Sequence, residues 1–354
     1  MKKPVVAVAG ATGVVGNVLL EVLKKKGFPL EKLLALASER SAGKKISTPF
    51  GRLTVGNADK ADYSKIDIVL ASAGSGWSKE NAQRIVDAGC TYIDNSSCFR
   101  YDPKIPLIIP QINRNDVGDS KLIANPNCTT AIAAIPLYQI YLEYGIKRAI
   151  ISTYQSTSGA GRDAMIENVE QTKAYLQGKN STKELVGNTA DYVRGKKVKV
   201  EQFPHPIAFN VIPRIDSIQD NNYTKEEMKT VWETRKIFGN KSLKISTTCV
   251  RVPTLRVHSE DVTVQTKEPV YLGALENKLR HTDGVEVVDD VRNDVYPMPL
   301  TATGKYDVEV GRLRHDLTYG EKSVKMWVSG DQLLRGAALN AVEIAELVLD
   351  RDFR

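Results

Sequence analysis

The stretch PVVAVAGATGVVG, residues 4–16, decides the fold. It opens with a short apolar run of the kind found in buried parallel strands, and a glycine-rich turn follows at once. An amphipathic segment then extends to about Lys26, where Gly27 predicts the end of a helix. Strand, glycine-rich turn and helix in this order are typical of the first unit of a doubly wound sheet that binds a dinucleotide.

Gly10, Gly13 and Gly16 give the turn a GxxGxxG spacing, a variant of the GxGxxG pattern of dinucleotide sites. Glycine suits these positions because the backbone turns sharply and must let a pyrophosphate approach the helix N-terminus. A tight turn without a ligand is the alternative interpretation. If a cofactor binds, we expect it at this turn and at the glycine turn that follows residues 66–73. The expected contacts are Gly10, Thr12, Gly13, Val14, Val15, Gly16, Ala73 and Gly74.

Further apolar runs continue the alternation of strand and helix through the first part of the chain. We expect strands at 33–38, 66–73, 91–97, 106–110 and 121–125, and a helix at 78–89. The pattern then changes, because later segments alternate polar and apolar residues as half-buried strands do. These segments are 149–158, 244–254, 261–267, 306–316 and 323–330, with helices near 161–177 and 225–238.

This order of elements predicts a Rossmann-type doubly wound α/β sheet followed by an α+β domain with a mixed sheet. The last helix, 333–350, is apolar on one face and has no sheet of its own nearby. We therefore expect it to return to the first domain. Residues 1–129 and 331–354 are assigned to the cofactor-binding domain, and residues 130–330 to the second domain.

The composition limits the classes of function. Of the 354 residues 42% are hydrophobic and 26% are charged, as in ordinary globular proteins, and the formal net charge is +7. No long Lys/Arg block occurs, which disfavours nucleic acid, and no run approaches the ~18 apolar residues of a membrane span. The four cysteines form no CxxC pair, so we expect neither a metal site nor a disulfide framework. These features favour a cytoplasmic protein whose basic surplus serves either anionic substrates or only a solvated surface.

The end of the second expected strand, Ser38-Glu39-Arg40-Ser41, bears on the choice of cofactor. NAD sites usually place an acidic residue here, where it binds the ribose hydroxyls. The hydroxyls of Ser38 and Ser41 and the guanidinium of Arg40 instead suit a 2′-phosphate, which favours NADP. The carboxylate of Glu39 would repel that phosphate, so the prediction of NADP requires Glu39 to point outward.

Cys128 is the candidate nucleophile, in the segment NPNCTT (125–130) that opens an apolar helical run. Asn127 is a suitable N-cap, which leaves Cys128 in the first turn, where free N–H groups and the helix dipole stabilise a thiolate. The same N–H groups and the Asn127 amide could hold an oxyanion formed by attack on a carbonyl. Pro136 should kink this helix or interrupt it. The alternative is that Cys128 is a small buried hydrophobic residue.

His258 is the candidate base among the four histidines. Arg251 lies seven residues before it and Arg256 two residues before it. A basic pair near an imidazole suits a substrate that carries a carboxylate. A histidine in such a context could also be an ordinary surface or core residue.

Four segments that occur in order and span nearly the whole chain resemble the aspartate-semialdehyde dehydrogenase family. They are GATGVVG at 10–16, ANPNCTTAI at 124–132, TYQSTSGAGR at 153–162 and CVRVPTLRVHSE at 249–260. The resemblance implies the reversible conversion of aspartate 4-semialdehyde, phosphate and NADP to 4-aspartyl phosphate and NADPH. That step serves lysine, threonine and methionine synthesis. The resemblance also implies a homodimer or homotetramer in which the second domain is the catalytic and dimerisation domain.

By the same resemblance, Cys128 is the nucleophile, His258 the acid and base, and Gln155 the residue that orients the substrate. Arg251 matches the arginine that holds the substrate α-carboxylate, and Arg100 and Lys229 match the residues that bind phosphate. The catalytic set is therefore Cys128, His258, Gln155 and Asn127, and the substrate-binding set is Arg100, Arg251, Glu226, Lys229, Ser158 and Gly159.

Position along one helix favours Glu226 over its neighbour as a site residue, and the resemblance adds Asn340. Glu226 lies three positions before Lys229, on the same helix face, whereas Glu227 forms a capping box with Thr224 and so has a structural role. Asn340 matches a residue near the nicotinamide amide, with an exposed helix residue as the alternative.

Other functions compete with this interpretation. Arg256 and Val257 are bulkier than the residues common before this histidine in the family, which could alter how His258 is presented. N-Acetyl-γ-glutamyl-phosphate reductase shares the fold and the cysteine thioester but takes a longer, N-acylated substrate. A glyceraldehyde-phosphate type dehydrogenase has a different motif around its cysteine. A dinucleotide-binding regulator without chemistry would not need the sulfur of Cys128.

Overall fold

β1 (Val5–Ala9) lies in the interior of a parallel six-stranded sheet, as its apolar run predicts. The structure is a computed structural model that describes residues 3–178 and 180–353. The strand order is β5-β2-β1-β6-β7-β8, so the chain changes from one side of β1 to the other between β5 and β6. Doubly wound sheets bind their ligands at such a reversal, outside the carboxyl ends of the strands. The remaining strands are β2 (Lys32–Ala37), β5 (Gly56–Asn57), β6 (Ile68–Ala71), β7 (Thr91–Asp94) and β8 (Leu122–Ala124).

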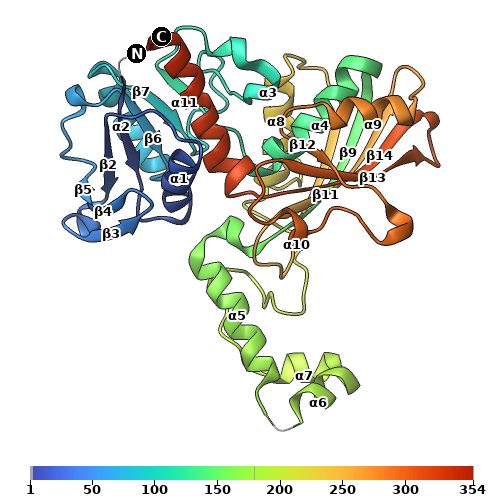
Figure 1. Ribbon diagram of the computed structural model, residues 1–354. Helices are drawn as coiled ribbons and strands as arrows, with labels where there is room; N and C mark the ends of the chain where they lie inside the picture. The colour runs from blue at the N-terminus through green and yellow to red at the C-terminus, as the bar shows by residue number, and fades with distance from the viewer. Residues whose placement is uncertain (1–2, 179, 354) are drawn as a thin grey trace.

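Helices cover both faces of this first sheet (Figure 1). α1 (Val14–Lys25) and α11 (Leu339–Asp352) share one apolar cluster with alternate residues of β1, whereas α2 (Ser75–Asp87) packs on the opposite face. The last helix therefore returns to the first sheet, as its apolar face predicted. A π-helical segment, Leu334–Ala338, precedes α11 and leads the chain back from the second sheet.

The second sheet is mixed and has the order β10-β9-β11-β14-β13-β12. β9 (Ile146–Gln155) pairs in parallel with β10 (Ile245–Arg251) and antiparallel with β11 (His258–Thr266). The other strands are β12 (Val285–Val287), β13 (Val308–Asp316) and β14 (Gly320–Gly330). One apolar cluster joins this sheet to α4 (Cys128–Tyr144), α8 (Lys225–Ile237) and α9 (Leu272–Arg280).

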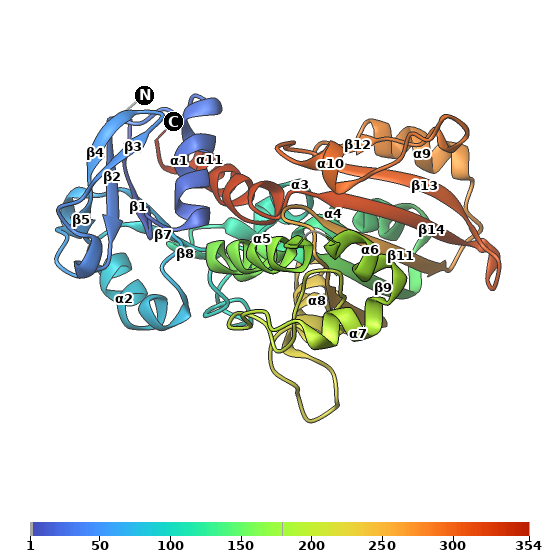
Figure 2. The same ribbon diagram turned by 90° about the horizontal axis from the view of Figure 1, so that it is seen from below.

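An arm of three helices projects away from both sheets (Figure 1). It consists of α5 (Arg162–Leu176), α6 (Ser181–Gly187) and α7 (Thr189–Gly195). The view from below shows that α5 begins under the junction of the two sheets (Figure 2). The arm therefore starts close to the segment that carries Ser158 and Gly159.

Several predicted elements require correction. Residues 106–110 are not a strand: Leu107 forms one isolated bridge with Ala124, and α3 (Pro110–Asn113) begins at the second proline. Both prolines lack an N–H, so this apolar run cannot form a full ladder. Pro136 does not interrupt α4, which continues to Tyr144. The sequence also did not reveal the hairpin of β3 (Lys45–Thr48) and β4 (Gly51–Thr54), the helices α6, α7 and α9, or the short α10 (Pro299–Ala302).

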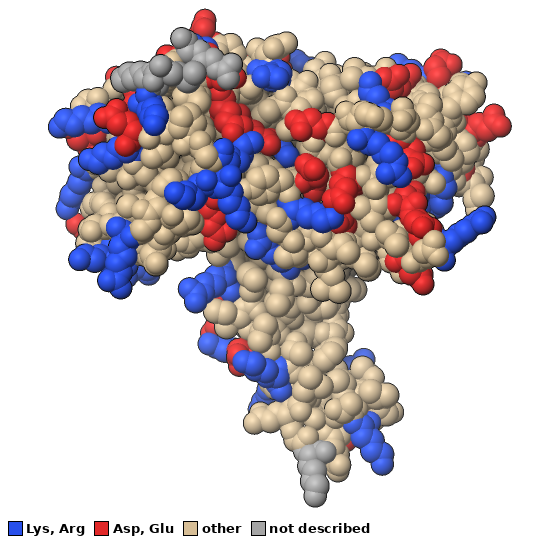
Figure 3. Space-filling model, viewed as in Figure 1, with Lys and Arg blue, Asp and Glu red and all other residues tan. Residues whose placement is uncertain are grey.

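Basic and acidic side chains are interspersed over the face seen in Figure 3, rather than gathered in one basic band. Within residues 3–178 and 180–353, no helix has the length and apolar character needed to cross a membrane. The same residues contain no group of three or more His, Cys, Asp or Glu that could hold a metal ion.

Candidate active site

Cys128 is the first residue of α4, and Asn127 caps the helix as predicted. The side-chain oxygen of Asn127 accepts hydrogen bonds from the N–H groups of Thr129 (3.0 Å) and Thr130 (3.4 Å). The segment before α11 packs directly on the cysteine, since a Cβ on Gly336 would lie 2.7 Å from the Cβ of Cys128. Residues more than two hundred positions apart therefore shape the surroundings of the nucleophile.

The structure contradicts the expected stabilisation of a Cys128 thiolate. The residue is half-buried, and desolvation raises the pKa of its thiol to about 11, with the charge of Glu226 as a further cause. The N–H groups of Thr129 and Thr130 are already bonded to Asn127, which leaves the N–H of Cys128 as the helix-end donor with no acceptor within the described chain. The sulfur is therefore a neutral thiol near pH 7 and needs a base to ionise it.

His258 is the first residue of β11 and is fully buried. Its Nδ1 accepts a hydrogen bond of 3.2 Å from the N–H of Ser156, while Nε2 has no partner in the described part of the chain. Burial first, and then the positive charge of Arg251, lower the pKa of His258 to about 3. The imidazole is therefore neutral at physiological pH, with Nε2 free to accept a proton if Nδ1 carries none.

Gly159 sits against two of the basic residues that the sequence singled out, Arg251 and His258. A Cβ at this position would lie 2.8 Å from Nη1 of Arg251 and 3.1 Å from Nε2 of His258. Only glycine fits there without displacing one of them. Arg251 ends β10, and its Nη1 donates a 2.7 Å hydrogen bond to the carbonyl of Ser156. The neighbouring Ser158 is buried and bonds to Ser156 and Gln332.

Glu226 is the centre of a buried polar cluster. Its carboxylate accepts hydrogen bonds from the Asn127 amide (3.1 Å), the Gln155 amide (3.5 Å) and the Lys229 ammonium (2.9 Å). Burial alone would raise the pKa of Glu226, but Lys229 and Asn127 hold it below its ordinary value. Gln155 also donates to the hydroxyl of Thr129 at 2.9 Å. The predicted capping box of Thr224 and Glu227 is confirmed, so Glu226 faces the site while Glu227 holds the helix start.

Arg100 is buried beside the Cys128 loop. Its guanidinium donates to the carbonyls of Asn125 and Asn95, each at 2.8 Å, and to the carboxylate of Glu233 at 3.2 Å. An arginine side chain has five N–H donors, so two remain after these three bonds. Lys229, the other expected phosphate ligand, is shared between Glu226 and Asp216.

The glycine turn after β1 has the close contacts of a cofactor cradle. Gly10 has a φ of +85°, and a Cβ there would lie 2.3 Å from the carbonyl oxygen of Ser72. A Cβ on Gly16 would lie 2.1 Å from the carbonyl oxygen of Gly10. Thr12 and Gly13 are exposed beside them, as are Ala73 and Gly74 after β6, whereas Val14 and Val15 are partly buried. The backbone here can thus approach a dinucleotide closely, which fits the expected group.

Glu39 is exposed and forms an ion pair with Lys60, which is not one of the expected phosphate ligands. Glu39–Ser41 form a turn of 3₁₀-helix after β2, and the carboxylate of Glu39 pairs with Lys60 at 2.7 Å. The side chains of Ser38 and Arg40 are exposed, and Ser41 is partly exposed. The carboxylate of Glu39 thus has a cationic partner in Lys60, and the expectation that Ser38, Arg40 and Ser41 bind a 2′-phosphate stays a prediction.

Asn340 is fully buried in α11 rather than exposed. Its amide donates to the carbonyl of Ile108 (2.9 Å) and to the side chain of Asn125 (2.6 Å), while its Oδ1 has no partner within the described chain. Asn125 belongs to the segment that carries Cys128. Asn340 thus links the last helix to the nucleophile loop and keeps one buried acceptor free.

Sequence reasoning missed Ser156 and Glu233. Ser156 fixes both His258 and Arg251, whereas Glu233 binds Arg100 and the N–H of Asn127. A signal for Glu233 was present, because positions 226, 229 and 233 follow the i, i+3, i+7 spacing of one helix face. Ser156 belongs to the segment TYQSTSGAGR that carries part of the resemblance, but its contacts with His258 and Arg251 depend on the pairing of β9 with β11 and could not be read from that segment.

Comparison with known proteins identifies the family to which the chain belongs. Residues 5–120 match the family described as semialdehyde dehydrogenase, NAD binding domain, and residues 136–335 match semialdehyde dehydrogenase, dimerisation domain. The chain is 42% identical to the aspartate-semialdehyde dehydrogenase of Aquifex aeolicus, over 97% of each chain. It is also 42% identical to that of Synechocystis sp., over 99% of each. The chain belongs to the aspartate-semialdehyde dehydrogenase family.

A solved structure of the family agrees with the architecture described above. Aspartate semialdehyde dehydrogenase II from Vibrio cholerae, determined in complex with ASA, is 40% identical, covers 100% of both chains and has a TM-score of 0.90. The predicted fold class, a Rossmann-type sheet with a second, mixed-sheet domain, is thereby confirmed. Aspartate-semialdehyde dehydrogenases are oxidoreductases, and this member carries both the NAD binding and the dimerisation domain of the family.

Proposed function

We propose that this protein catalyses the reversible, phosphate-dependent oxidation of aspartate 4-semialdehyde to 4-aspartyl phosphate, with NADP as cofactor and a thioester on Cys128. In the biosynthetic direction the reaction runs in reverse and serves lysine, threonine and methionine synthesis. The position of Glu226 carries the proposal. Its carboxylate binds the side chains of Asn127, which caps the Cys128 helix, and of Gln155. The charges of Glu226 and Arg251 also influence the pKa values of both Cys128 and His258. A nucleophile, a base and carboxylate-binding groups thus share one buried cluster.

The proposal divides the chain by role. Residues 1–129 and 331–354 bind the cofactor, and residues 130–330 carry catalysis and dimerisation. Arg40, flanked by Ser38 and Ser41, would hold the 2′-phosphate of NADP, because Glu39 is paired with Lys60. Arg100 and Lys229 would hold inorganic phosphate, the former through its two remaining N–H donors. A homodimer or homotetramer is the expected assembly.

The mechanism starts from a neutral thiol and a neutral imidazole. His258 takes the proton of Cys128 at Nε2, and the sulfur adds to the aldehyde carbon. The N–H of Cys128 and the second N–H of the Asn127 amide hold the resulting oxyanion. The bound nicotinamide cofactor supplies the hydride acceptor for this oxidation. Cys128 then carries an acyl thioester, which phosphate cleaves, and the thiolate that leaves recovers its proton from His258.

Arg251 and Glu226 act on the substrate rather than on the bond changes. The guanidinium of Arg251 pairs with the substrate α-carboxylate, and Glu226 provides a negative charge for the substrate ammonium group. Gln155 holds the acyl group between them through its amide. A longer, N-acylated substrate has no ammonium group for Glu226, which favours this function over N-acetyl-γ-glutamyl-phosphate reductase.

The test is NADP reduction with aspartate semialdehyde, measured with and without phosphate in the unsubstituted protein and in Cys128→Ala. We expect turnover only with phosphate and only when the sulfur is present. NADP should bind equally to both proteins. Equal rates in both would exclude the thioester, and turnover of N-acetylglutamate semialdehyde alone would support the rival reductase.

A further inference from the structure

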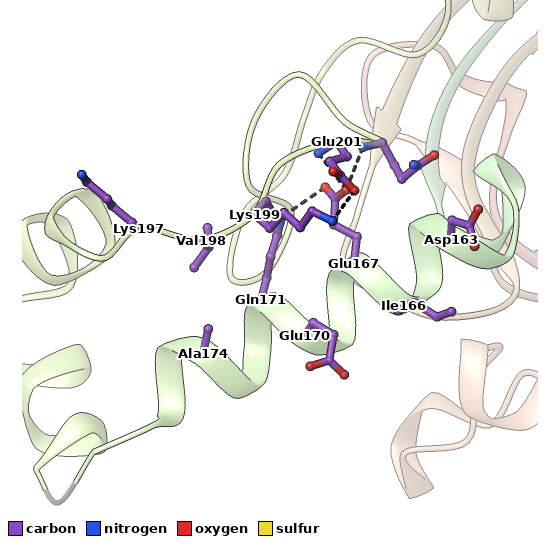
Figure 4. Close-up of a pocket in the computed structure, with 11 residues that line it drawn as sticks. Asp163, Ile166, Glu167, Glu170, Gln171, Ala174, Lys197, Val198, Lys199 and Glu201 are labelled. Carbon is purple, nitrogen blue, oxygen red and sulfur yellow. Dashed lines mark hydrogen bonds and ion pairs between the residues drawn. The ribbon is translucent and has the colours of Figure 1, made fainter.

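A pocket of about 420 Å³ lies between α5 and residues 197–202. These residues lead into an irregular segment, residues 199–212, which we call the strap. The strap has no helix or strand of its own and forms only one isolated bridge, between Ile212 and Arg251. Figure 4 shows two side chains of α5, Glu167 and Gln171, that point across this pocket to the strap. They occupy positions i and i+4 and so share one helix face.

Glu167 and Gln171 anchor the strap at two places. The carboxylate of Glu167 accepts hydrogen bonds from the N–H groups of Glu201 (2.9 Å) and Gln202 (2.7 Å). The oxygen of Gln171 accepts from the N–H groups of Ile207 (2.8 Å) and Ala208 (3.2 Å). Both anchors are almost completely buried, and charge-assisted bonds to a buried carboxylate are among the stronger hydrogen bonds.

Phe203 lies between the two anchored parts of the strap. Its ring is 9% exposed and stands over the guanidinium of Arg251, 6.0 Å from ring centroid to Cζ. Ile212, at the end of the strap, exchanges two backbone hydrogen bonds of 2.9 Å with Arg251. The strap therefore holds both the backbone and one face of this arginine.

Arg251 is a buried cation that forms no ion pair with an Asp or Glu among residues 3–178 and 180–353. A carboxylate in contact would occupy its N–H donors, whereas an aromatic ring stabilises the charge from one face and leaves the edges free. Among the residues that the structure describes, only the carbonyl of Ser156 bonds to these edges, as acceptor from Nη1. The remaining donors are available to a carboxylate of the substrate.

We propose that Phe203 is a positioning residue for recognition of the substrate carboxylate, held on Arg251 by the anchors Glu167 and Gln171. The inference rests on the proposed function, in which Arg251 binds the carboxylate of aspartate semialdehyde. Phe203 itself acts only through Arg251: its ring fixes the guanidinium plane and stabilises its charge. The arm helix α5 thereby tunes the affinity for one substrate without contacting it.

The primary test replaces the ring by an aliphatic side chain. Phe203→Leu should raise the KM for aspartate semialdehyde about fivefold, while kcat and the KM values for phosphate and NADP change less than twofold. Phe203→Tyr keeps the aromatic face and should restore the original KM. A fall in kcat with an unchanged KM for the semialdehyde would mean that Phe203 has only a structural role, and would overturn the proposal.

Glu167→Gln supplies a second test that leaves Phe203 in place, and it decides the matter if Phe203→Leu fails to fold. It should raise the same KM severalfold because the strap loses a charged anchor. The matched control is Glu170→Gln, since Glu170 is on the same helix but is exposed and pairs with Lys173 on the helix surface. Equal KM values for these two variants would contradict the anchoring.

Arg251→Ala separates this inference from the proposed function. A large increase in the semialdehyde KM for Arg251→Ala, with no change for Phe203→Leu, would overturn only the role of Phe203. An unchanged KM for Arg251→Ala would mean that Arg251 does not bind the substrate carboxylate. Neither that part of the proposed function nor the inference about Phe203 would then stand.

Discussion

Glu233 accepts a 2.6 Å hydrogen bond from the backbone N–H of Asn127, the residue immediately before the nucleophile. Its other oxygen accepts from Arg100 at 3.2 Å. One fully buried carboxylate therefore joins the residue expected to bind phosphate to the loop that carries Cys128. Since Glu233 lies on α8 with Glu226 and Lys229, this helix fixes both the nucleophile and the anion-binding groups around it.

Glu233→Gln should disturb both connections at once. An amide has one oxygen, so either the N–H of Asn127 or the guanidinium of Arg100 must face an NH₂ group. An unsatisfied buried donor costs about 1–3 kcal/mol, and the charge of Arg100 loses its counter-ion. We expect the free energy of unfolding in urea to fall by about 2 kcal/mol and kcat/KM to fall at least tenfold.

Glu276→Gln is the matched control for this experiment, because Glu276 is a partly exposed residue of α9 that pairs with Arg280 on the helix surface. Such a pair contributes only about 0.3–0.5 kcal/mol. If Glu233→Gln were as stable and as active as Glu276→Gln, the link between Arg100 and the Cys128 loop would have no energetic importance.

The first sheet and the cap of Cys128 could be predicted because their signals are local. The apolar run and glycine turn of residues 4–16 specify β1 and α1, and Asn127 specifies the start of α4 through its own side chain. Apolar character alone could not separate a strand from a proline-bounded loop, which is why residues 106–110 were assigned wrongly.

The chemistry of the site depends on contacts that no local pattern contains. Ser156 meets His258 only because β9 pairs with β11, and Cys128 is buried partly by Gly336, which follows β14. The helix N-terminus predicted a low thiol pKa, but burial and the charge of Glu226 outweigh it. Desolvation is a property of the packed molecule and cannot be obtained from spacing along the chain.

The raised pKa of Cys128 predicts slow alkylation at neutral pH. The thiolate is the reactive species, so the rate with iodoacetamide should increase through pH 9–11 instead of reaching a plateau near pH 7. Glu226→Gln removes a negative charge that raises this pKa, and should increase the rate at pH 8 severalfold. Alkylation at Cys128 is measured by mass spectrometry of the modified peptide.

This measurement is best made in a Cys98→Ser background, since Cys98 is also partly accessible while Cys90 and Cys249 are buried. A rate that is already maximal at pH 7, in the protein without ligands, would show that the helix terminus dominates and that the thiol is ionised before the substrate arrives.

Arg40→Ala should alter the choice between the two cofactors. Loss of a charged donor to the 2′-phosphate should raise the KM for NADP at least tenfold, with little change in the KM for NAD. Glu39→Ala is the comparison, because that carboxylate is exposed and paired with Lys60. This substitution should change the KM for NADP less than twofold. Unchanged preference in Arg40→Ala would mean that another group binds the 2′-phosphate.

Gly10→Ala should damage the cofactor turn, whereas the same substitution at Gly76 should not. The Cβ of an alanine at position 10 would lie 2.3 Å from the carbonyl oxygen of Ser72, and the residue would have to keep a φ of +85°. Backbone strain and overpacking of this kind cost about 2–4 kcal/mol together. At position 76, in the first turn of α2, a Cβ meets nothing within 4 Å, so alanine should stabilise the helix by up to about 1 kcal/mol.

Urea unfolding and NADP binding, measured on both variants, compare them directly. Similar stability and affinity in the two proteins would show that the turn after β1 yields easily, and that its glycines are not required for the close approach of β1 to β6.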